Sequence, residues 1–248
     1  MDKIVLITGA SRGIGAATAL LAARQGWAVV VNYARNAAAA DAVARQIADA
    51  GGNAMAVQAD VADEAQVLAL FDTVDRRWGR LRALVNNAGV VDRAAPVAEM
   101  DGPRLRRMFD VNVLGSFYCA REAVRRMSTR RGGAGGSIVN VSSAAARLGA
   151  AHQYVDYAAA KGAVDVLTLG LAREVAAEGI RVNAVRPGLI DTEIHASGGL
   201  PDRVRELAHL VPMGRGGSAE EVAQAIVWLL SDASPYTTMT LMEVSGGR

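Results

Sequence analysis

Short apolar segments alternate with longer stretches of helical period along the 248-residue chain. The runs Ile4–Ile7 and Val29-Val30-Val31 are continuously apolar, which is typical of parallel strands buried on both faces. This alternation predicts an α/β fold: a doubly wound, seven-stranded parallel sheet with helices on both faces. The strands are expected at residues 4–8, 28–32, 54–58, 83–85, 137–141, 181–185 and 241–244. The helices are expected at residues 14–25, 38–49, 64–78, 104–127, 157–177 and 219–230.

Chain length and composition favour a single domain spanning residues 1–248. With 51% hydrophobic residues the chain can bury a sizeable core, and α/β folds of this length often stay undivided. Asp63 with Gln66, and Ser218 with Glu221, match capping boxes and predict two helix starts. One long irregular stretch, residues 189–217, interrupts the alternation. Its position after a strand end predicts a lid over a ligand site.

Charge and cysteine content argue against several classes of function. The net charge of +2 gives no electrostatic reason to expect a nucleic acid or an anionic membrane as partner. The apolar run that starts near Met1 and Asp2 is too short for a signal peptide or a membrane span. The single cysteine, Cys119, cannot form an internal disulfide and offers no metal cluster. We therefore expect a cytoplasmic protein that binds no metal.

A glycine-rich loop follows the first predicted strand and opens the first predicted helix. Its sequence is Thr8-Gly9-Ala10-Ser11-Arg12-Gly13-Ile14-Gly15. Glycines at these positions allow a tight turn and a close approach of the backbone to a phosphate, whose charge is stabilised at the amino end of a helix. A tight turn without a ligand is the alternative, but the strand–loop–helix context favours a dinucleotide site.

The end of the second predicted strand bears on which dinucleotide binds. NAD-selective folds place an acidic residue there, where it binds the ribose hydroxyls. This chain instead continues Asn32-Tyr33-Ala34-Arg35, and Arg12 projects from the glycine loop. Two arginines without a carboxylate favour a ribose phosphate, so NADP(H) is predicted over NAD(H), which stays possible. An Arg35 side chain that simply points into solvent is the alternative.

A tyrosine and a lysine four residues apart are the candidate catalytic pair. Of the 27 basic residues only Lys3 and Lys161 are lysines, and Lys161 follows Tyr157 by four positions in a predicted helix. Side chains at this spacing share one helix face, and a fixed ammonium lowers the pKa of a phenol by stabilising the phenolate. The pair therefore predicts a proton donor and acceptor. An exposed helical pair without catalytic function is the alternative.

With these motifs in place, the chain resembles the short-chain dehydrogenase/reductase family, in its short single-domain subgroup. The matching segments follow one another in order along the chain. They are the Thr-Gly-x-x-x-Gly-x-Gly loop, Asp60-Val61, Asn86-Asn87-Ala88-Gly89, Asn112, Ser142-Ser143, Tyr157 with Lys161, Pro187-Gly188 and Ser245-Gly246-Gly247. The chain is similar in particular to bacterial glucose dehydrogenase-like and 3-oxoacyl carrier-protein reductase-like oxidoreductases. The resemblance implies a Rossmann-type domain.

The resemblance also implies roles for individual residues. Tyr157 matches the family's catalytic acid/base, Lys161 the residue that lowers the pKa of the tyrosine and binds the nicotinamide ribose, and Asn112 the residue that holds a relay water. Ser143 matches the serine that hydrogen-bonds the substrate carbonyl. Because the tyrosine lies one residue further on than in many relatives, Ser142 is the alternative. Taken together, the motifs give the cofactor-binding positions Gly9, Ser11, Arg12, Gly13, Ile14, Gly15, Asn32, Tyr33, Arg35, Asp60, Val61, Asn86, Asn87, Ala88, Gly89, Tyr157, Lys161, Pro187, Gly188, Ile190 and Thr192.

The predicted function is hydride transfer between NADP(H) or NAD(H) and a small carbonyl or alcohol substrate. A catalytically silent nucleotide sensor or interaction protein of the same fold is the alternative, although the serine, tyrosine and lysine are all present. An enoyl reductase fits less well, because that branch usually spaces its tyrosine and lysine more widely. The family further implies a homotetramer, in which the helices predicted at 104–127 and 157–177 pair between subunits.

The lid segment leaves the substrate unspecified. Few charges lie near its start, so no strong site for a multiply anionic ligand is expected there. Arg203, Arg205 and Arg215 farther along are candidates for contact with a phosphate or a carrier arm. His152 and His195 border the expected cleft, and ordinary surface roles are expected for them.

Overall fold

The computed structural model describes residues 3–248, apart from the side chain of His195, so Met1 and Asp2 lie outside the described residues. Within this part of the chain, one seven-stranded parallel sheet forms in the order β3-β2-β1-β4-β5-β6-β7. The predicted fold class is confirmed. The strands are β1 (Ile4–Ile7), β2 (Ala28–Tyr33), β3 (Ala54–Gln58), β4 (Ala83–Asn86), β5 (Gly136–Val141), β6 (Ile180–Pro187) and β7 (Leu241–Val244).

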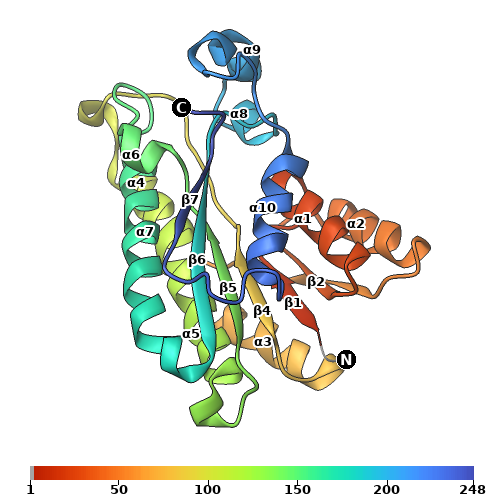
Figure 1. Cartoon of the computed structure of the whole chain (residues 1–248). Helices are drawn as coiled ribbons and strands as arrows, with labels where there is room; N and C mark the ends of the chain where they lie inside the picture. Colours follow the sequence, from red (N-terminus) through yellow and green to blue (C-terminus); the bar gives the residue numbers. More distant parts are fainter. Residues whose placement is uncertain (1–2) are drawn as a thin grey trace.

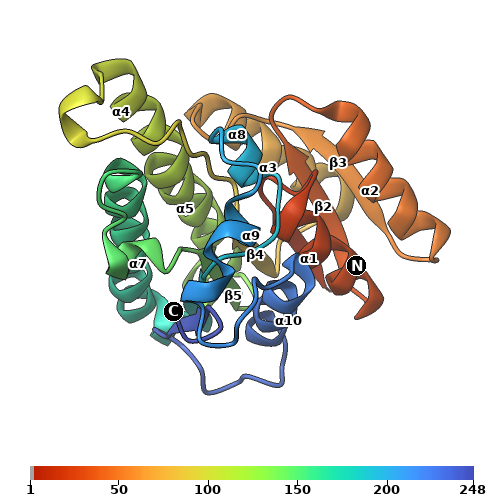
Figure 2. The same ribbon diagram turned by 90° about the horizontal axis from the view of Figure 1, so that it is seen from above.

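Helices cover both faces of this sheet (Figures 1 and 2). One face is covered by α1 (Gly13–Arg24), α2 (Ala37–Asp49) and α10 (Ala219–Leu230). The other face is covered by α3 (Glu64–Trp78), α5 (Gly115–Met127) and α7 (Val155–Val175). Shorter elements complete the connections: α4 (Gly102–Phe109), α6 (Ala145–Leu148) and the 3-10 turns Val97–Glu99, Thr129–Arg131 and Ala176–Glu178. Of the helices in the described residues, none has the length and apolar content needed to cross a bilayer.

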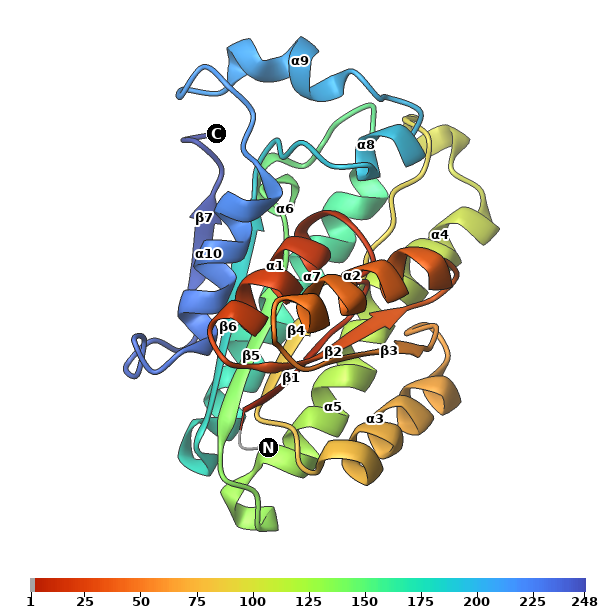
Figure 3. The ribbon, with the colours of Figure 1, turned by 90° about the vertical axis from the view of Figure 1, so that its right-hand side faces the viewer.

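Residues 189–217, the predicted lid, leave the end of β6 and lie above the carboxyl ends of the strands (Figure 3). Two backbone hydrogen bonds close the base of this segment, from Gly217 N to Leu189 O and from Asp191 N to Gly217 O, each 2.9 Å long. The base is therefore fixed beside β6. The elements of the segment are α8 (Ile194–Ser197), α9 (Arg203–Leu207) and the 3-10 turn Ala208–Leu210.

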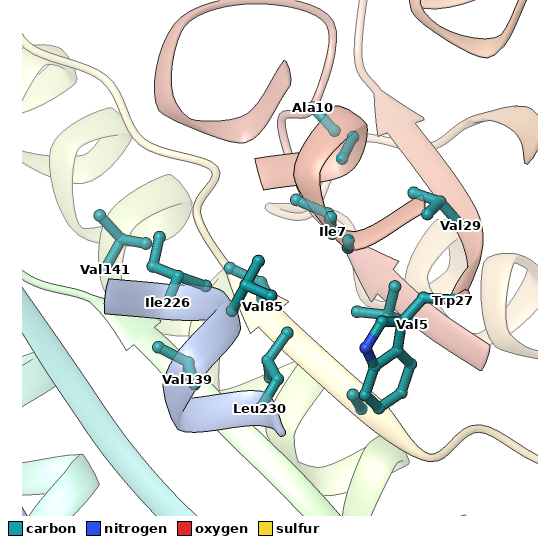
Figure 4. Packing of buried hydrophobic residues seen from close by; sticks show 14 of the residues in the cluster. Val5, Ile7, Ala10, Trp27, Val29, Val85, Val139, Val141, Ile226 and Leu230 are labelled. Carbon is teal, nitrogen blue, oxygen red and sulfur yellow. The ribbon is translucent and has the colours of Figure 1, made fainter. Parts of the chain in front are cut away.

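The core is divided between the two faces by the alternation of side chains along each strand. In β1, Val5 and Ile7 belong to the cluster under α1 and α10, whereas Ile4 and Leu6 belong to the cluster under α3 and α5. Figure 4 shows how α10 closes the first cluster, with its apolar side chains over β4 and β5. Burial on both sides explains why the strands are continuous apolar runs in the sequence.

The capping residues start two helices as predicted, with one difference. At α10, Ser218 and Glu221 form a complete capping box. At α3, the Asp63 side chain accepts from the N–H groups of Ala65 and Gln66. In a capping box Gln66 would accept from Asp63 N, but its Oε1 accepts from Asp60 N at 2.9 Å instead. The side chain of Gln66 thereby fixes the end of the β3–α3 connection.

The helix predicted at residues 104–127 is present without a gap, as α4, a π-helical turn at Asp110–Leu114 and α5. Asn112 lies in the π-helical turn, and its Nδ2 donates to Met108 O at 2.9 Å, in competition with the backbone donors of the helix. Periodicity alone does not reveal such competition.

Candidate active site

A cleft of about 1150 Å³ opens between the glycine loop, the start of α7 and the lid segment. It lies at the carboxyl ends of the strands, where β1 is flanked by β2 on one side and β4 on the other. Doubly wound sheets bind ligands at such a reversal of strand order. The predicted residues that line the cleft are Gly9, Ser11, Arg12, Gly13, Ile14, Asn32, Tyr33, Arg35, Asp60, Val61, Asn87, Ala88, Gly89, Ser142, Ser143, Tyr157, Lys161, Pro187, Gly188, Ile190 and Thr192.

Side chains from two strand ends hold the glycine loop in place. Thr8 Oγ1 donates to Val85 O and accepts from the N–H groups of Asn87 and Ala88, both at 3.0 Å. The Asn87 amide donates to Thr8 O at 2.8 Å and to Gly9 O at 3.0 Å. The loop after β1 is therefore joined to the loop after β4 before any ligand binds.

The amino end of α1 fits a dinucleotide phosphate. Gly13, its first residue, has a φ of 54°, which favours glycine. A Cβ atom on Gly15 would lie 2.5 Å from Asn87 Nδ2 and 2.6 Å from Gly9 O, so the third glycine is required by packing. The residue before the helix, Arg12, provides no side-chain cap. The N–H groups of the first turn are therefore available to an anion at the cleft.

The predicted adenosine end of the cleft is formed by the ends of β2 and β3. Asn32 is buried; its Oδ1 accepts from Gly9 N at 3.3 Å and its Nδ2 donates to Ala59 O at 3.0 Å. Asn32 thus fixes the strand ends. Arg12 and Arg35 are exposed on the rim, and among residues 3–248 neither forms an ion pair. Their charges are free to meet an anionic group.

Tyr157, Ser143 and Lys161 meet on the floor of the cleft. Tyr157 lies in the first turn of α7, and the Ser143 side chain lies close enough to its hydroxyl to lower the pKa of the phenol. The Lys161 Nζ lies 5.6 Å from the centre of the Tyr157 ring and donates to Val141 O at 2.8 Å. Ser142 Oγ instead donates to Lys161 O at 3.2 Å. The serine beside the tyrosine is therefore Ser143.

Burial dominates the titration of this pair. Desolvation raises the pKa of Tyr157 to about 12, against the hydrogen bond with Ser143, which lowers it. Desolvation lowers the pKa of Lys161 to about 8, against the charge of Asp165, which raises it. Burial thus raises the pKa of Tyr157, whereas Lys161 was predicted to lower it, and the effect of Lys161 with a dinucleotide bound stays a prediction. The ammonium is itself desolvated and bonded to a backbone carbonyl, so burial outweighs its charge.

A chain of charges leads from Lys161 away from the cleft. Asp165, one turn later on α7, is buried, and its Oδ2 accepts from Arg186 of β6 at 2.8 Å. Arg186 also donates to Glu243 of β7 at 3.1 Å. Asp165 Oδ1 is buried and has no hydrogen-bond partner among residues 3–248. A carboxylate behind the lysine favours its charged form.

Three of the predicted residues lie behind the cleft lining: Gly15, Asn86 and Asn112. Asn112 is fully buried, and its amide bonds both the N–H and the C=O of Val90 at 3.1 Å. Asn86 donates to Asn140 Oδ1 at 2.9 Å within the core. These side chains support the wall formed by residues 87–91. The relay role of Asn112 stays a prediction.

The predicted nicotinamide end of the cleft is formed by the segment after β6. A Cβ atom on Gly188 would lie 2.7 Å from Ser245 Cα, so the C-terminal segment packs directly behind it. Thr192 Cγ2 lies 3.4 Å from the position of a Cβ on Gly13. The start of the lid segment therefore lies directly beside the glycine loop.

Known proteins resemble this chain over almost its full length. A family model described as enoyl-(acyl carrier protein) reductase matches residues 9–248. The uncharacterized oxidoreductase YgfF of Escherichia coli (strain K12) is 56% identical over 245 residues, which cover 99% of each chain. The chain belongs to the short-chain dehydrogenase/reductase family.

Two further proteins support this family assignment. The cis-4-hydroxycyclohexanecarboxylate dehydrogenase of Sinomonas cyclohexanicum is 44% identical over 247 residues, covering 99% of this chain and 96% of that protein. The crystal structure of a short-chain type dehydrogenase/reductase from Mycobacterium marinum has a TM-score of 0.92 at 36% identity, covering 99% of this chain and 94% of that one. The resemblance inferred from the sequence motifs is confirmed, and the protein is an oxidoreductase of this family.

Sequence reasoning missed an ion pair next to Tyr157 in this short-chain dehydrogenase/reductase. The Asp156 side chain is fully buried, and Arg104 of α4 donates from Nε to Oδ2 at 2.7 Å and from Nη2 to Oδ1 at 3.2 Å. Asp156 Oδ1 also accepts from Tyr157 N at 2.9 Å. The pair therefore holds α4 against the start of α7. An acid directly before the tyrosine was the available signal, and nothing in the sequence marks Arg104 as its partner.

The remaining candidate ligands add little to the site. Among the described residues, no group of three or more His, Cys, Asp or Glu side chains could hold a metal ion. His152 is exposed and lies outside the cleft lining. The side chain of His195 lies outside the described residues.

The titration of Lys161 is directly measurable, because the chain contains two lysines. Selective 15N-lysine labelling gives two Nζ signals, and a Lys3→Arg variant assigns them. We expect a midpoint for Lys161 at about pH 8 in the cofactor-free protein, because burial disfavours the ammonium. Asp165→Asn removes the charge that favours the ammonium, so the midpoint should move to lower pH.

The control for this titration is Asp72→Asn, on the exposed surface of α3, which should leave the midpoint in place. A midpoint for Lys161 near 10.5, its ordinary value, would contradict the account. An unchanged midpoint in Asp165→Asn would show that Asp165 does not act on the lysine.

Proposed function

We propose that this protein is an NADP(H)-preferring oxidoreductase that transfers a hydride between nicotinamide and a carbonyl or alcohol substrate. The observation that carries the proposal is the contact between the Tyr157 and Ser143 hydroxyls, above a buried Lys161, in the same cleft as the glycine loop. Residues 1–248 act as one catalytic domain, with residues 189–217 as its lid, because segments from both halves of the chain form one sheet and one cleft.

The chain's own residues supply proton transfer and stabilisation of charge. A bound nicotinamide supplies the hydride. With its pKa raised to about 12 by burial, Tyr157 holds its proton near neutral pH and can donate it to a carbonyl oxygen. Ser143 donates a hydrogen bond to the same oxygen as negative charge develops. Lys161 binds the ribose and, through its charge, lowers the energy of the phenolate that Tyr157 becomes.

A hydroxyl/carbonyl pair is favoured over an enoyl group as the reacting centre. The relative from Sinomonas cyclohexanicum is named as a dehydrogenase of a hydroxy compound, and it matches 99% of this chain. The four-residue spacing of Tyr157 and Lys161 places both groups on one face of α7, beside the Ser143 hydroxyl. A nucleotide sensor without catalytic activity is the alternative function. Turnover of a substrate distinguishes the oxidoreductase from the sensor.

The preference for NADP(H) rests on Arg12 and Arg35. Both are exposed on the rim at the adenosine end of the cleft, and neither is paired with a carboxylate among residues 3–248. A phosphate on the adenosine ribose would meet two free guanidinium groups there, whereas a ribose hydroxyl would gain little from them. The inferred cofactor is therefore NADP(H), with NAD(H) as a poorer substitute.

A homotetramer in the cytoplasm completes the proposal. Apolar side chains are exposed along the helices predicted to pair between subunits, including Phe117 of α5 and Val166 of α7. Ala159 and Gly170 of α7 are also exposed, and a Cβ atom on Gly170 would meet nothing within 4 Å, so a partner helix can approach closely. The proposed cytoplasmic location rests on the cysteine content, because the single cysteine, Cys119, is a buried free thiol, as expected in a reducing compartment.

The proposed activity is tested with a panel of ketones, aldoses, quinones, acyl thioesters and hydroxycyclohexanecarboxylates, each with NADPH or NADP⁺. We expect turnover of at least one class. Tyr157→Phe should keep NADPH binding, measured by cofactor fluorescence, and lose about 10²- to 10⁴-fold in kcat, because the proton donor is removed.

The matched control is Tyr236→Phe, because Tyr236 is fully exposed and lies outside the cleft lining. Its kcat should equal that of the wild type. NADPH binding without turnover of any panel compound would favour the silent sensor, and a nearly active Tyr157→Phe variant would end the assignment of the acid/base.

Cofactor preference is tested by steady-state kinetics with NADPH and NADH. We expect a higher kcat/KM with NADPH, and Arg35→Ala should lower it about tenfold or more, since one charge-assisted contact to the phosphate is lost. Kinetics with NADH should change little. Arg45→Ala, on the exposed side of α2, is the matched control and should leave kcat/KM unchanged with both NADPH and NADH. A wild-type preference for NADH would refute the argument from the two arginines.

A further inference from the structure

Two arginines line the end of the cleft that lies beside the catalytic tyrosine. They are Arg203 of α9 and Arg248 of the C-terminal segment, and they share this wall with Tyr154. The Arg203 guanidinium carbon lies 5.3 Å from the centre of the Tyr154 ring. Tyr154 is the residue before α7 and precedes Tyr157 by three positions. Arg203 is therefore placed near the reacting end of the cleft, far along the chain from the glycine loop.

The lid segment and the C-terminal segment form one continuous wall here. Met213 N donates to Gly246 O at 3.1 Å, and a Cβ atom on Gly246 would lie 2.7 Å from Val211 Cγ1. The same C-terminal segment packs behind Gly188, in the predicted nicotinamide seat. Arg203 and Arg248 thus approach the cleft from two different segments that are held together.

From the sequence alone, Arg203, Arg205 and Arg215 are equal candidates for contact with an anion. Their surroundings in the structure differ. Arg205 pairs with Asp202 at 2.9 Å, and Arg215 pairs with Glu221 at 2.6 Å; both arginines are exposed and outside the cleft lining. Arg203 lines the cleft and, among residues 3–248, has no carboxylate partner.

The arginine pair is not neutralised from within the cleft. Among residues 3–248, Arg248 also forms no ion pair, and burial lowers the pKa of Arg203, which the charge of Arg248 lowers further. Three acidic side chains line the cleft: Asp60, Asp110 and Glu193. Glu193 lies by the glycine loop, 3.7 Å from the position of a Cβ on Gly13, and Asp110 lies in the π-helical turn between α4 and α5. Asp60 lies at the adenosine end, after β3.

We propose that Arg203 and Arg248 bind an anionic group, a carboxylate or a phosphate, on the carbonyl or alcohol substrate. Guanidinium groups match the geometry of both anions, and two unpaired cations on one wall repel each other until an anion lies between them. The inference rests on the proposed function, since it names the class of substrate for the same site. The anion anchors one end of the substrate at the lid, and the carbonyl at the other end meets Ser143 and Tyr157.

The experiment uses matched pairs of compounds with the full-length protein and NADPH. A series of straight-chain keto acids of increasing length is compared with the corresponding methyl esters, and dihydroxyacetone phosphate is compared with dihydroxyacetone. We expect kcat/KM to be about tenfold or more higher for the anion of a pair, because a charge-assisted contact is gained. The pair with the largest ratio of kcat/KM, anion over neutral compound, shows which anion is preferred and how far it lies from the carbonyl of the substrate.

Variants show whether the arginines cause this preference. Arg203→Met and Arg248→Met should each reduce the anion-to-neutral ratio about tenfold or more, mainly through KM. Arg205→Met should leave the ratio unchanged, because Arg205 is exposed, paired with Asp202 and outside the cleft lining. Arg203→Lys, which keeps a charge without the planar fork, should retain part of the preference.

The outcomes separate this inference from the proposed function. Equal turnover of acids and esters, or an equal effect of Arg203→Met and Arg205→Met, would overturn the anion site and leave the oxidoreductase in place. Without any turnover, thermal shift with the keto acids and NADPH decides the question. A shift that Arg203→Met abolishes would support the anion site while the proposed reaction fails, and the absence of a shift would overturn the anion site too.

Discussion

The hydrogen bonds between Thr8 and Asn87 hold the end of β1 against the end of β4, and the geometry of the cleft depends on them. They fix the backbone of the glycine loop at the point where the strand order reverses. β4 pairs with β5, whose end leads to Ser143, and α7 packs on β6 and carries Tyr157. The glycine loop and the hydroxyls of Ser143 and Tyr157 therefore belong to one rigid frame. The Thr8 hydroxyl and the Asn87 amide can hold such a frame because both are hydrogen-bonded.

Burial on the floor of the cleft determines how the catalytic groups behave. It keeps the phenol of Tyr157 protonated and disfavours the ammonium form of Lys161. Asp165 opposes the desolvation of the lysine from behind. Among residues 3–248, arginines without an ion pair line both ends of the cleft, including Arg35 at the predicted adenosine end and Arg203 in the lid segment. An anionic cofactor and an anionic substrate would together complete the electrostatics of the site.

Local patterns in the sequence were sufficient for most of the fold and for the centre of the site. Continuous apolar runs predicted the strands, because a parallel strand that is buried on both faces consists mostly of apolar residues. The glycine loop and the four-residue spacing of Tyr157 and Lys161 are equally local. Contacts between distant segments were not predictable: Arg104 meets Asp156 from 52 positions away, and Arg203 shares a wall with Arg248. The direction of the Tyr157 pKa in the cofactor-free protein was not predictable either, since burial depends on the packed structure.

The most direct test of the central claim is a crystal structure of the protein with NADPH bound. The account predicts the pyrophosphate at the amino end of α1, the ribose phosphate beside Arg35, and the nicotinamide between Pro187 and the Tyr157 hydroxyl. Its reactive carbon should then leave room for a carbonyl at about 3–3.5 Å, within reach of Ser143 and Tyr157. A dinucleotide bound with its nicotinamide away from Tyr157, or bound outside this cleft, would contradict the account.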